Sequence, residues 1–170
     1  GMAQLSAACS GSKFRPCRTR MPNSQKSEVQ VLAPYDAVLD TNLVLDLFLF
    51  HDPAVESLMT ALAEGELRWI CTETMQLELI RVLGYPKIAK ALSGHKVSAN
   101  QLLEQASRCW HQVSVPMNIG ITARCQDRDD QIFVDLAVAH QAKLFSKDKA
   151  VLALAKALMR CNVMVLRQWQ

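Results

Sequence analysis

Apolar and polar residues alternate in short blocks from about residue 37 onward. Five short apolar runs have the length and composition of buried strands; they are Ala37–Asp40, Leu67–Cys71, Gln112–Val115, Lys143–Ser146 and Val163–Leu166. Between them, apolar residues recur at intervals of three and four, which predicts amphipathic helices. These predicted helices are Ala54–Ala63, Glu73–Leu83, Ala99–Trp110, Asp130–Gln141 and Lys149–Met159.

The second of these helices carries the clearest end signals. Thr72 and Thr74 are start signals, and Gly84 followed by Pro86 marks the end. The stripe that we expect this helix to bury is Leu77, Ile80 and Leu83.

Strands that alternate with helices predict a parallel sheet with helices on both faces. We therefore expect one three-layer α/β/α domain over residues 35–170, with a central parallel sheet of about five strands. A chain of 170 residues is long enough to bury such a core. No apolar run approaches the ~20 residues that span a bilayer, since Asp46 interrupts the best candidate, Leu43 to Phe50. We expect no membrane association.

Residues 1–34 have a different composition and form a predicted N-terminal arm rich in Ser and Arg. The arm holds five basic residues and one acidic residue, whereas the remainder holds 14 basic and 15 acidic residues. The basic excess therefore belongs to the arm and not to the domain. A disordered arm, a transit peptide, or an over-extended start with Met21 as a later initiation site are the open interpretations. Gly1 is interpreted as a remnant of cloning.

The six cysteines form no Cys-x-x-Cys pair and have no histidine at zinc-finger spacing. Cys71 and Cys161 lie in or beside apolar segments, as small core residues do. This usage is typical of a reducing compartment, so we expect a cytoplasmic protein.

Four acidic residues stand where strands and helices meet. Asp40 closes the first predicted strand, and Asp148 follows the strand that ends at Ser146. Ligands of open α/β sheets bind at the carboxyl ends of strands. Asp130 opens a helix, where the helix dipole favours a carboxylate, and Glu78 lies within a helix, three residues before a possible partner, Arg81.

Taken singly, each acid has a simpler interpretation. Asp40 and Asp148 fit helix caps, the run from Asp127 to Asp130 fits a solvated capping loop, and Glu78 fits a surface helix residue. Crowded carboxylates repel one another unless a cation neutralises them. Carboxylate oxygens are the ligands that Mg²⁺ and Mn²⁺ prefer, and two such ions ~3.5–4 Å apart can cleave a phosphodiester. The joint pattern therefore favours a metal site.

With these residues in place, the chain resembles the PIN-domain nucleases, and most closely the bacterial group described as toxin components of toxin–antitoxin systems. The resemblance covers about residues 36–166. The segments that carry it are Val38-Leu39-Asp40-Thr41-Asn42; Glu78-Leu79-Ile80-Arg81-Val82-Leu83 leading into Tyr85-Pro86-Lys87-Ile88; Asp127-Arg128-Asp129-Asp130-Gln131-Ile132-Phe133 running on to Ala137; and Phe145-Ser146-Lys147-Asp148.

The resemblance implies the roles of individual residues. Asp40, Glu78, Asp130 and Asp148 would be the catalytic and metal-binding acids. Asp130 is assigned as the third acid because it precedes Phe133 by three residues and Ala137 by seven. The auxiliary residues would be Asp127 and Asp129, with Asn42 and Ser146 orienting carboxylates or water.

The resemblance also implies an activity and partners. The activity would be Mg²⁺- or Mn²⁺-dependent cleavage of single-stranded RNA, restrained by a cognate antitoxin, in a homodimer or higher homo-oligomer. Two features depart from the family pattern: the acids Asp46 and Asp52 near the first motif, and the basic arm. The arm could contact RNA phosphates or pack on another subunit.

Two other functions remain open. A small-molecule phosphatase could use Asp40 as a covalent nucleophile, although that chemistry normally has a second acid two residues later, where this chain has Asn42. A non-catalytic module could keep the fold and bind RNA or a protein. Other catalytic patterns are missing from the sequence: there is no Gly-x-Ser-x-Gly elbow and no phosphate-binding Gly-rich loop.

Overall fold

The computed structural model describes residues 33–114 and 123–170. Nearly all of the predicted arm lies outside these residues, as does Val115. The strands are β1 (Tyr35–Leu39), β2 (Leu67–Cys71), β3 (Trp110–Gln112), β4 (Lys143–Phe145) and β5 (Val165–Leu166). The helices are α1 (Thr41–Leu45), the π-helical η1 (Asp46–Phe50), the 3-10 turn η2 (Pro53–Val55), α2 (Glu56–Ala63), α3 (Glu73–Leu83), α4 (Pro86–His95), α5 (Ala99–Ser107), α6 (Gln131–His140), α7 (Lys149–Ala153) and α8 (Ala155–Met159).

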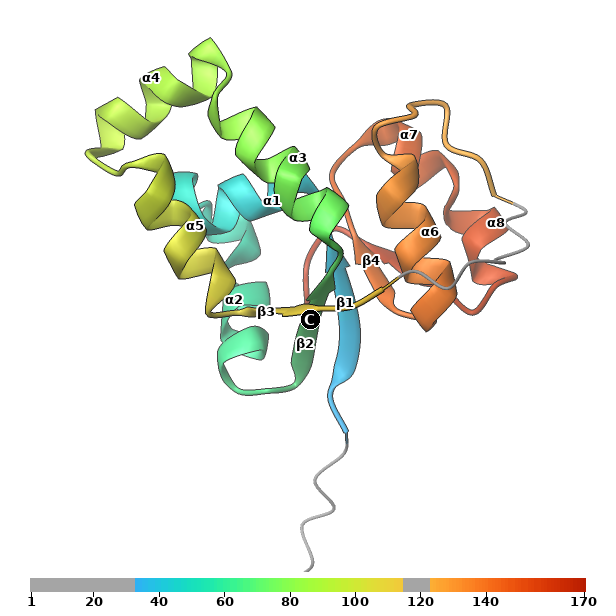
Figure 1. The fold of residues 1–170 in the computed structure, drawn as a ribbon. Helices are drawn as coiled ribbons and strands as arrows, with labels where there is room; N and C mark the ends of the chain where they lie inside the picture. Colours follow the sequence, from blue (N-terminus) through green and yellow to red (C-terminus); the bar gives the residue numbers. More distant parts are fainter. Residues whose placement is uncertain (1–32, 115–122) are drawn as a thin grey trace, which may run out of the picture. The chain divides into compact units, whose positions relative to one another are not determined.

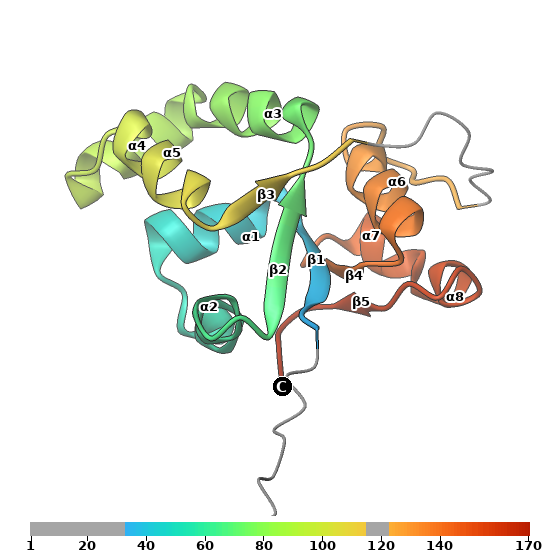
Figure 2. The same ribbon diagram turned by 60° about the horizontal axis from the view of Figure 1, so that its bottom comes forward.

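The five strands form one parallel sheet in the order β3-β2-β1-β4-β5. Helices α1 to α5 cover one face of the sheet, and α6 to α8 cover the other (Figures 1 and 2). The predicted α/β class, the parallel pairing and the two helical layers are therefore confirmed.

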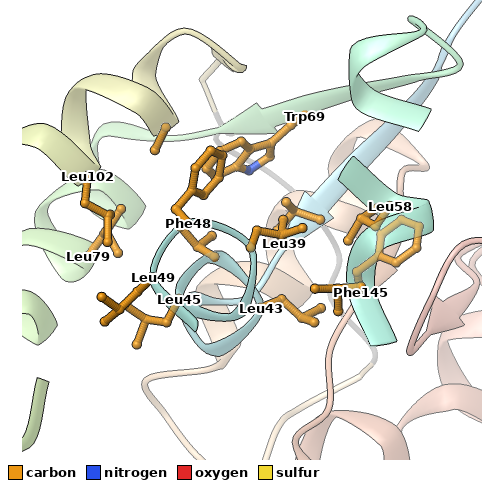
Figure 3. Packing of buried hydrophobic residues seen from close by; sticks show 14 of the residues in the cluster. Leu39, Leu43, Leu45, Phe48, Leu49, Leu58, Trp69, Leu79, Leu102 and Phe145 are labelled. Atoms are coloured by element: carbon orange, nitrogen blue, oxygen red, sulfur yellow. The ribbon is translucent and has the colours of Figure 1, made fainter. Parts of the chain in front are cut away.

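Each face of the sheet has its own hydrophobic core, because side chains alternate along a strand. Leu39 and Phe145 pack with α1, η1 and α2, whereas Val38 and Leu144, their neighbours in β1 and β4, pack with α6 to α8. Figure 3 shows Leu43, Leu45, Phe48 and Leu49 of α1 and η1 in the middle of the first cluster. The two helical segments that follow β1 thus anchor its carboxyl end.

The three tryptophans pack against other aromatic rings of the fold. Trp69 stacks with Phe48 at a centroid distance of 6.0 Å and meets Trp110 edge-on at 5.6 Å. The ring centroids of Trp169 and Phe145 lie 6.3 Å apart. None of these contacts resembles a row of aromatic rings open to stacking bases.

Several element boundaries differ from the sequence prediction. The predicted Ala99–Trp110 helix ends at Ser107, because Trp110 already belongs to β3. The predicted helix Lys149–Met159 is two short helices separated at Leu154. The pattern does not predict α4, where Pro86 begins a helix instead of following one, a position that proline tolerates because the first helical N–H has no partner. It also does not predict the helical segments α1 and η1.

The predicted buried stripe of α3 is wrong in two of its three residues. Leu77 and Ile80 are exposed, by 59% and 51%, whereas Met75, Leu79 and Leu83 are buried. The helix carries apolar residues on more than half of its circumference, so two stripes fit the helical period equally well. Only packing against the sheet and its neighbouring helices selects one of them.

No helix within the described ranges is long and apolar enough to cross a membrane.

Candidate active site

The strand order creates a crevice at the carboxyl ends of β1 and β4. The chain leaves β1 toward β2 on one side, while β4 lies on the other side of β1. Such a reversal of strand order is where open α/β sheets bind ligands. The Asp40 N–H donates to the carbonyl oxygen of Phe145 at 3.1 Å, so Asp40 and the residues after β4 are held together by the sheet itself.

Asp40 is the buried acid of this crevice, with 2% of its surface exposed. Its Oδ1 accepts a hydrogen bond from the Leu43 N–H at 2.8 Å and so caps α1. Its Oδ2 is buried and has no hydrogen-bond partner among the described residues. Burial raises the pKa of Asp40, and the Ser146 side chain and the backbone amides of Leu43 and Lys147 only partly oppose that shift. One carboxylate oxygen is therefore held without a partner where an unpaired charge is costly.

Ser146 and Asp148 follow β4, and both act on Asp40: the Ser146 side chain favours its ionised form, whereas the charge of Asp148 disfavours it. The fully buried Ser146 hydroxyl oxygen accepts a hydrogen bond from the Asp148 N–H at 3.0 Å. Asp148 Oδ1 in turn accepts from the Ala150 N–H at 2.6 Å and caps α7. The helix-cap interpretation is thus confirmed for both Asp40 and Asp148, but in Asp40 it accounts for only one of the two oxygens.

The pKa of Asp130 is raised by its burial and by the acids around it. Burial is the first cause that raises its pKa to about 6, and the charges of Asp148, Asp127, Asp40 and Asp129 raise it further. Its side chain makes no capping hydrogen bond to the described part of α6. Like charges that share a site disfavour ionisation, so the neighbouring carboxylates add to the effect of burial on the pKa of Asp130.

Glu78 faces the crevice from α3 and is paired with Arg81. The Arg81 Nε donates to Glu78 Oε2 and the Nη2 to Oε1, both at 2.8 Å, which is a two-pronged ion pair. The same Nη2 lies 3.3 Å from Asp129 Oδ2. The pairing of Glu78 with Arg81 that the sequence analysis expects is confirmed, and it extends to a third residue.

Asp40, Asp130 and Glu78 line one cleft of about 600 Å³. Its lining residues are Asp40, Thr41, Asn42, Leu45, Glu78, Val82, Tyr85, Pro86, Lys87, Ile88, Asp129, Asp130 and Phe133. Five of the eight predicted site residues are among them. The other three are Asp148 and Asp127, which act on Asp130 through their charges, and the buried Ser146 beneath Asp148.

The acids lie at one end of the sheet, but their side chains as placed do not form a complete metal-binding site. Within residues 33–114 and 123–170, no three His, Cys, Asp or Glu side chains are placed so that they could hold an ion together. Glu78 is directed to Arg81, and Asp40 offers a single unpartnered oxygen.

The structure adds residues to which the sequence analysis gave no role. Lys147 donates to Asp46 at 2.9 Å and to Asp52 at 2.7 Å, which explains the two extra acids near the first motif. About a hundred residues separate the partners, so no local pattern could have paired them. Tyr85 and Lys87 are part of the quoted resemblance and prove to line the cleft.

Comparison with known proteins agrees with this arrangement. The family model described as "PIN domain" matches residues 36–150, more than half of the chain and all four of the proposed metal-binding acids. The chain belongs to the PIN-domain family. PIN domains are generally nucleases and typically use divalent metal ions. No curated protein matches the chain.

Proposed function

We propose that this PIN domain is a Mg²⁺- or Mn²⁺-dependent endoribonuclease that cleaves single-stranded RNA. The observation that carries the proposal is Asp40, a buried acid whose Oδ2 lacks a hydrogen-bond partner in the described part of the chain and which lines the cleft. A buried carboxylate oxygen left unpaired is costly unless something binds it, and a hard cation is the ligand that suits it.

The surrounding donor set fits the same ion. Asp130 and Asp148 interact with Asp40 through their charges, and a divalent cation would relieve that repulsion. We assign Asp40, Asp130 and Asp148 as the acids that hold the metal, with Glu78 joining from α3. When bound, the metal supplies an activated water and stabilises the leaving oxygen of the phosphodiester.

The remaining residues position these acids and the substrate. Ser146 fixes the backbone of Asp148, and the exposed Asn42 presents an amide at the cleft that can orient water or a carboxylate. Lys87 brings a positive charge to the cleft, where a phosphate of the substrate would approach. The preference for RNA over DNA comes from the resemblance of the motifs.

The two alternatives are less well supported. A phosphatase that used Asp40 as its nucleophile would need an acid at residue 42, which is Asn. A non-catalytic module that binds RNA would have no use for a buried, unpaired carboxylate, because anionic RNA is repelled by it.

The direct test is cleavage of labelled single-stranded RNA with Mn²⁺, with Mg²⁺ and with EDTA, using the wild-type protein and Asp40→Asn side by side. Asn also caps helices, so the variant should keep α1 and the fold, as circular dichroism would verify. We expect cleavage by the wild type only with metal, and none by the variant. Full Mn²⁺-dependent cleavage by Asp40→Asn would overturn the mechanism. A single-stranded DNA of the same sequence tests the preference for RNA.

Metal binding can be followed without any substrate. A ligand that binds only the native state raises the melting temperature by mass action. Millimolar Mn²⁺ should therefore raise the Tm of the wild type and leave that of Asp40→Asn unchanged. Equal shifts in both proteins would mean that the ion binds elsewhere.

We further propose that the protein is the toxin of a toxin–antitoxin pair and acts as a homodimer or higher homo-oligomer. This step rests on the resemblance of the motifs to the toxin group. Induced expression in a bacterial host should arrest growth with the wild type and not with Asp40→Asn, and light scattering would give the oligomeric state. Normal growth with the active nuclease would remove the toxin role and keep the enzyme.

A further inference from the structure

Arg81 does not itself line the cleft, but it binds two acids that do, Glu78 and Asp129. It binds Glu78 through both carboxylate oxygens and reaches Asp129 at 3.3 Å. Glu78 belongs to α3 and Asp129 to the segment before α6, so Arg81 joins two parts of the cleft that are 48 residues apart in sequence. The guanidinium is thus the positive charge that is paired with Glu78 and Asp129 in this structure.

We propose that Arg81 is an internal counter-ion that competes with the divalent metal for Glu78. The inference rests on the metal site of the proposed function and goes beyond it, because it assigns to a residue of this chain the control of metal affinity. In the absence of metal, Arg81 neutralises Glu78 and Asp129. When the metal enters, Glu78 turns to the ion and Arg81 is released.

The geometry favours competition over simple support of Glu78. Both oxygens of Glu78 already accept charge-assisted hydrogen bonds from Arg81, which draws the carboxylate toward the guanidinium. A positive charge at this position also repels a divalent cation that approaches the same carboxylate. The incomplete cluster of acids in the described residues agrees with a Glu78 that is engaged elsewhere.

Arg81 can leave Glu78 without disturbing the core. Its side chain is 52% exposed, against 19% for that of Glu78. The guanidinium carbon lies 5.9 Å from the centre of the Tyr85 ring. The guanidinium already lies over this ring while it is paired with Glu78. Because a cation over a tyrosine ring is attracted by it, this contact can be kept when Arg81 leaves Glu78.

The test is calorimetric titration with Mn²⁺, without RNA, of the wild type, Arg81→Gln, Arg81→Lys and Asp40→Asn. Arg108→Gln is the matched control, since Arg108 pairs with Glu104 on α5, an acid that does not line the cleft. We expect Arg81→Gln to bind Mn²⁺ about three- to tenfold more tightly than the wild type, as the loss of one nearby positive charge predicts. Arg81→Lys should fall between them, because it keeps the charge and loses the two-pronged geometry. Arg108→Gln should match the wild type.

The alternative role gives the opposite sign. If Arg81 only orients Glu78 for the metal, Arg81→Gln binds Mn²⁺ more weakly. Weaker or unchanged binding by Arg81→Gln, together with wild-type binding that is lost in Asp40→Asn, would overturn this inference and leave the proposed function standing. If neither the wild type nor Arg81→Gln binds Mn²⁺, both fail. Should Arg81→Gln not fold, Arg81→Lys decides by the same comparison.

Discussion

The two sides of the cleft are built in different ways. On one side, Asp40 and Ser146 are buried, and backbone hydrogen bonds of the sheet and of two helix starts fix their positions. On the other side, Glu78 and Arg81 lie on the surface of α3 and are positioned by their own ion pair.

This difference separates a rigid half of the site from an adaptable half. Moving the Asp40 backbone requires breaking its hydrogen bond to Phe145 of β4, and turning its buried side chain breaks the cap of α1. Moving Glu78 or Arg81 requires only new rotamers of partly exposed side chains, whose ion pair contributes little to stability in water. We therefore expect substitutions behind Asp40 to affect folding and substitutions around Glu78 to affect ligand affinity.

The largest effect should come from Phe145→Ala, which removes a fully buried ring behind the rigid half. Such a truncation leaves a cavity and costs about 3–5 kcal/mol of unfolding free energy. Urea denaturation followed by circular dichroism would measure the loss. A loss below about 1 kcal/mol would mean that the carboxyl end of β4 is not the rigid support that we infer.

A smaller effect should appear in the pH dependence of stability, through Asp130. Its pKa is raised to about 6 in the native state, so the native state holds the proton more tightly than the unfolded chain does. The resulting stabilisation is full below the unfolded-state pKa of about 3.8 and is lost as the pH rises through about 6. In EDTA, Asp130→Asn should therefore lose less stability than the wild type between pH 4 and 7. We expect a difference of about 1 kcal/mol, less than the full shift implies, because the carboxyl is partly solvated.

The control for this comparison is Glu104→Gln, which removes an exposed carboxylate that does not line the cleft. Its stability should follow the wild type across the same pH range. Parallel curves for Asp130→Asn and the wild type would show that burial and the neighbouring acids do not raise the pKa of Asp130 as inferred.

The smallest effect is expected on the outer surface of α3. Leu77→Ala should change the unfolding free energy by no more than about 0.5 kcal/mol, because Leu77 is exposed. The matched variant Leu79→Ala, two residues along the same helix, should cost about 2–5 kcal/mol, because Leu79 is buried. Thermal or urea unfolding of the pair would compare the two faces directly, and equal losses would contradict the orientation of α3.

Local patterns could predict much of the fold. The bounds predicted for β2 and α3 agree with the structure, because an alternating or helical apolar pattern with a clear cap is a strong signal. The same signals are ambiguous where a proline both ends and begins a helix, which is why α4 is missed at Pro86. They also cannot choose between two apolar stripes on one helix, as Leu77 and Ile80 illustrate.

The candidate site could likewise be predicted only in part from the sequence. Asp40 and Asp148 could be found from the sequence because each follows a strand, and parallel strands bring their carboxyl ends to one edge. The pairing of Glu78 with Arg81 could be found because residues three apart are neighbours on a helix. The link from Arg81 to Asp129 and the double ion pair of Lys147 could not, because they join residues that no local spacing relates.

The sequence by itself determined the class of fold and the alternation of five strands with helices, and it singled out four acids that lie within the segment matched by the PIN-domain family model. It did so because the spacing of apolar residues, and the acids that directly follow a strand, can be recognised from residues close together in the sequence. Only the tertiary structure decided which oxygen of Asp40 lacks a partner, how Asp130 is affected by its neighbours, and which cation occupies Glu78. The burial of a side chain and the electrostatic potential around it depend on segments that are far apart in the sequence, so both are set only when the chain folds.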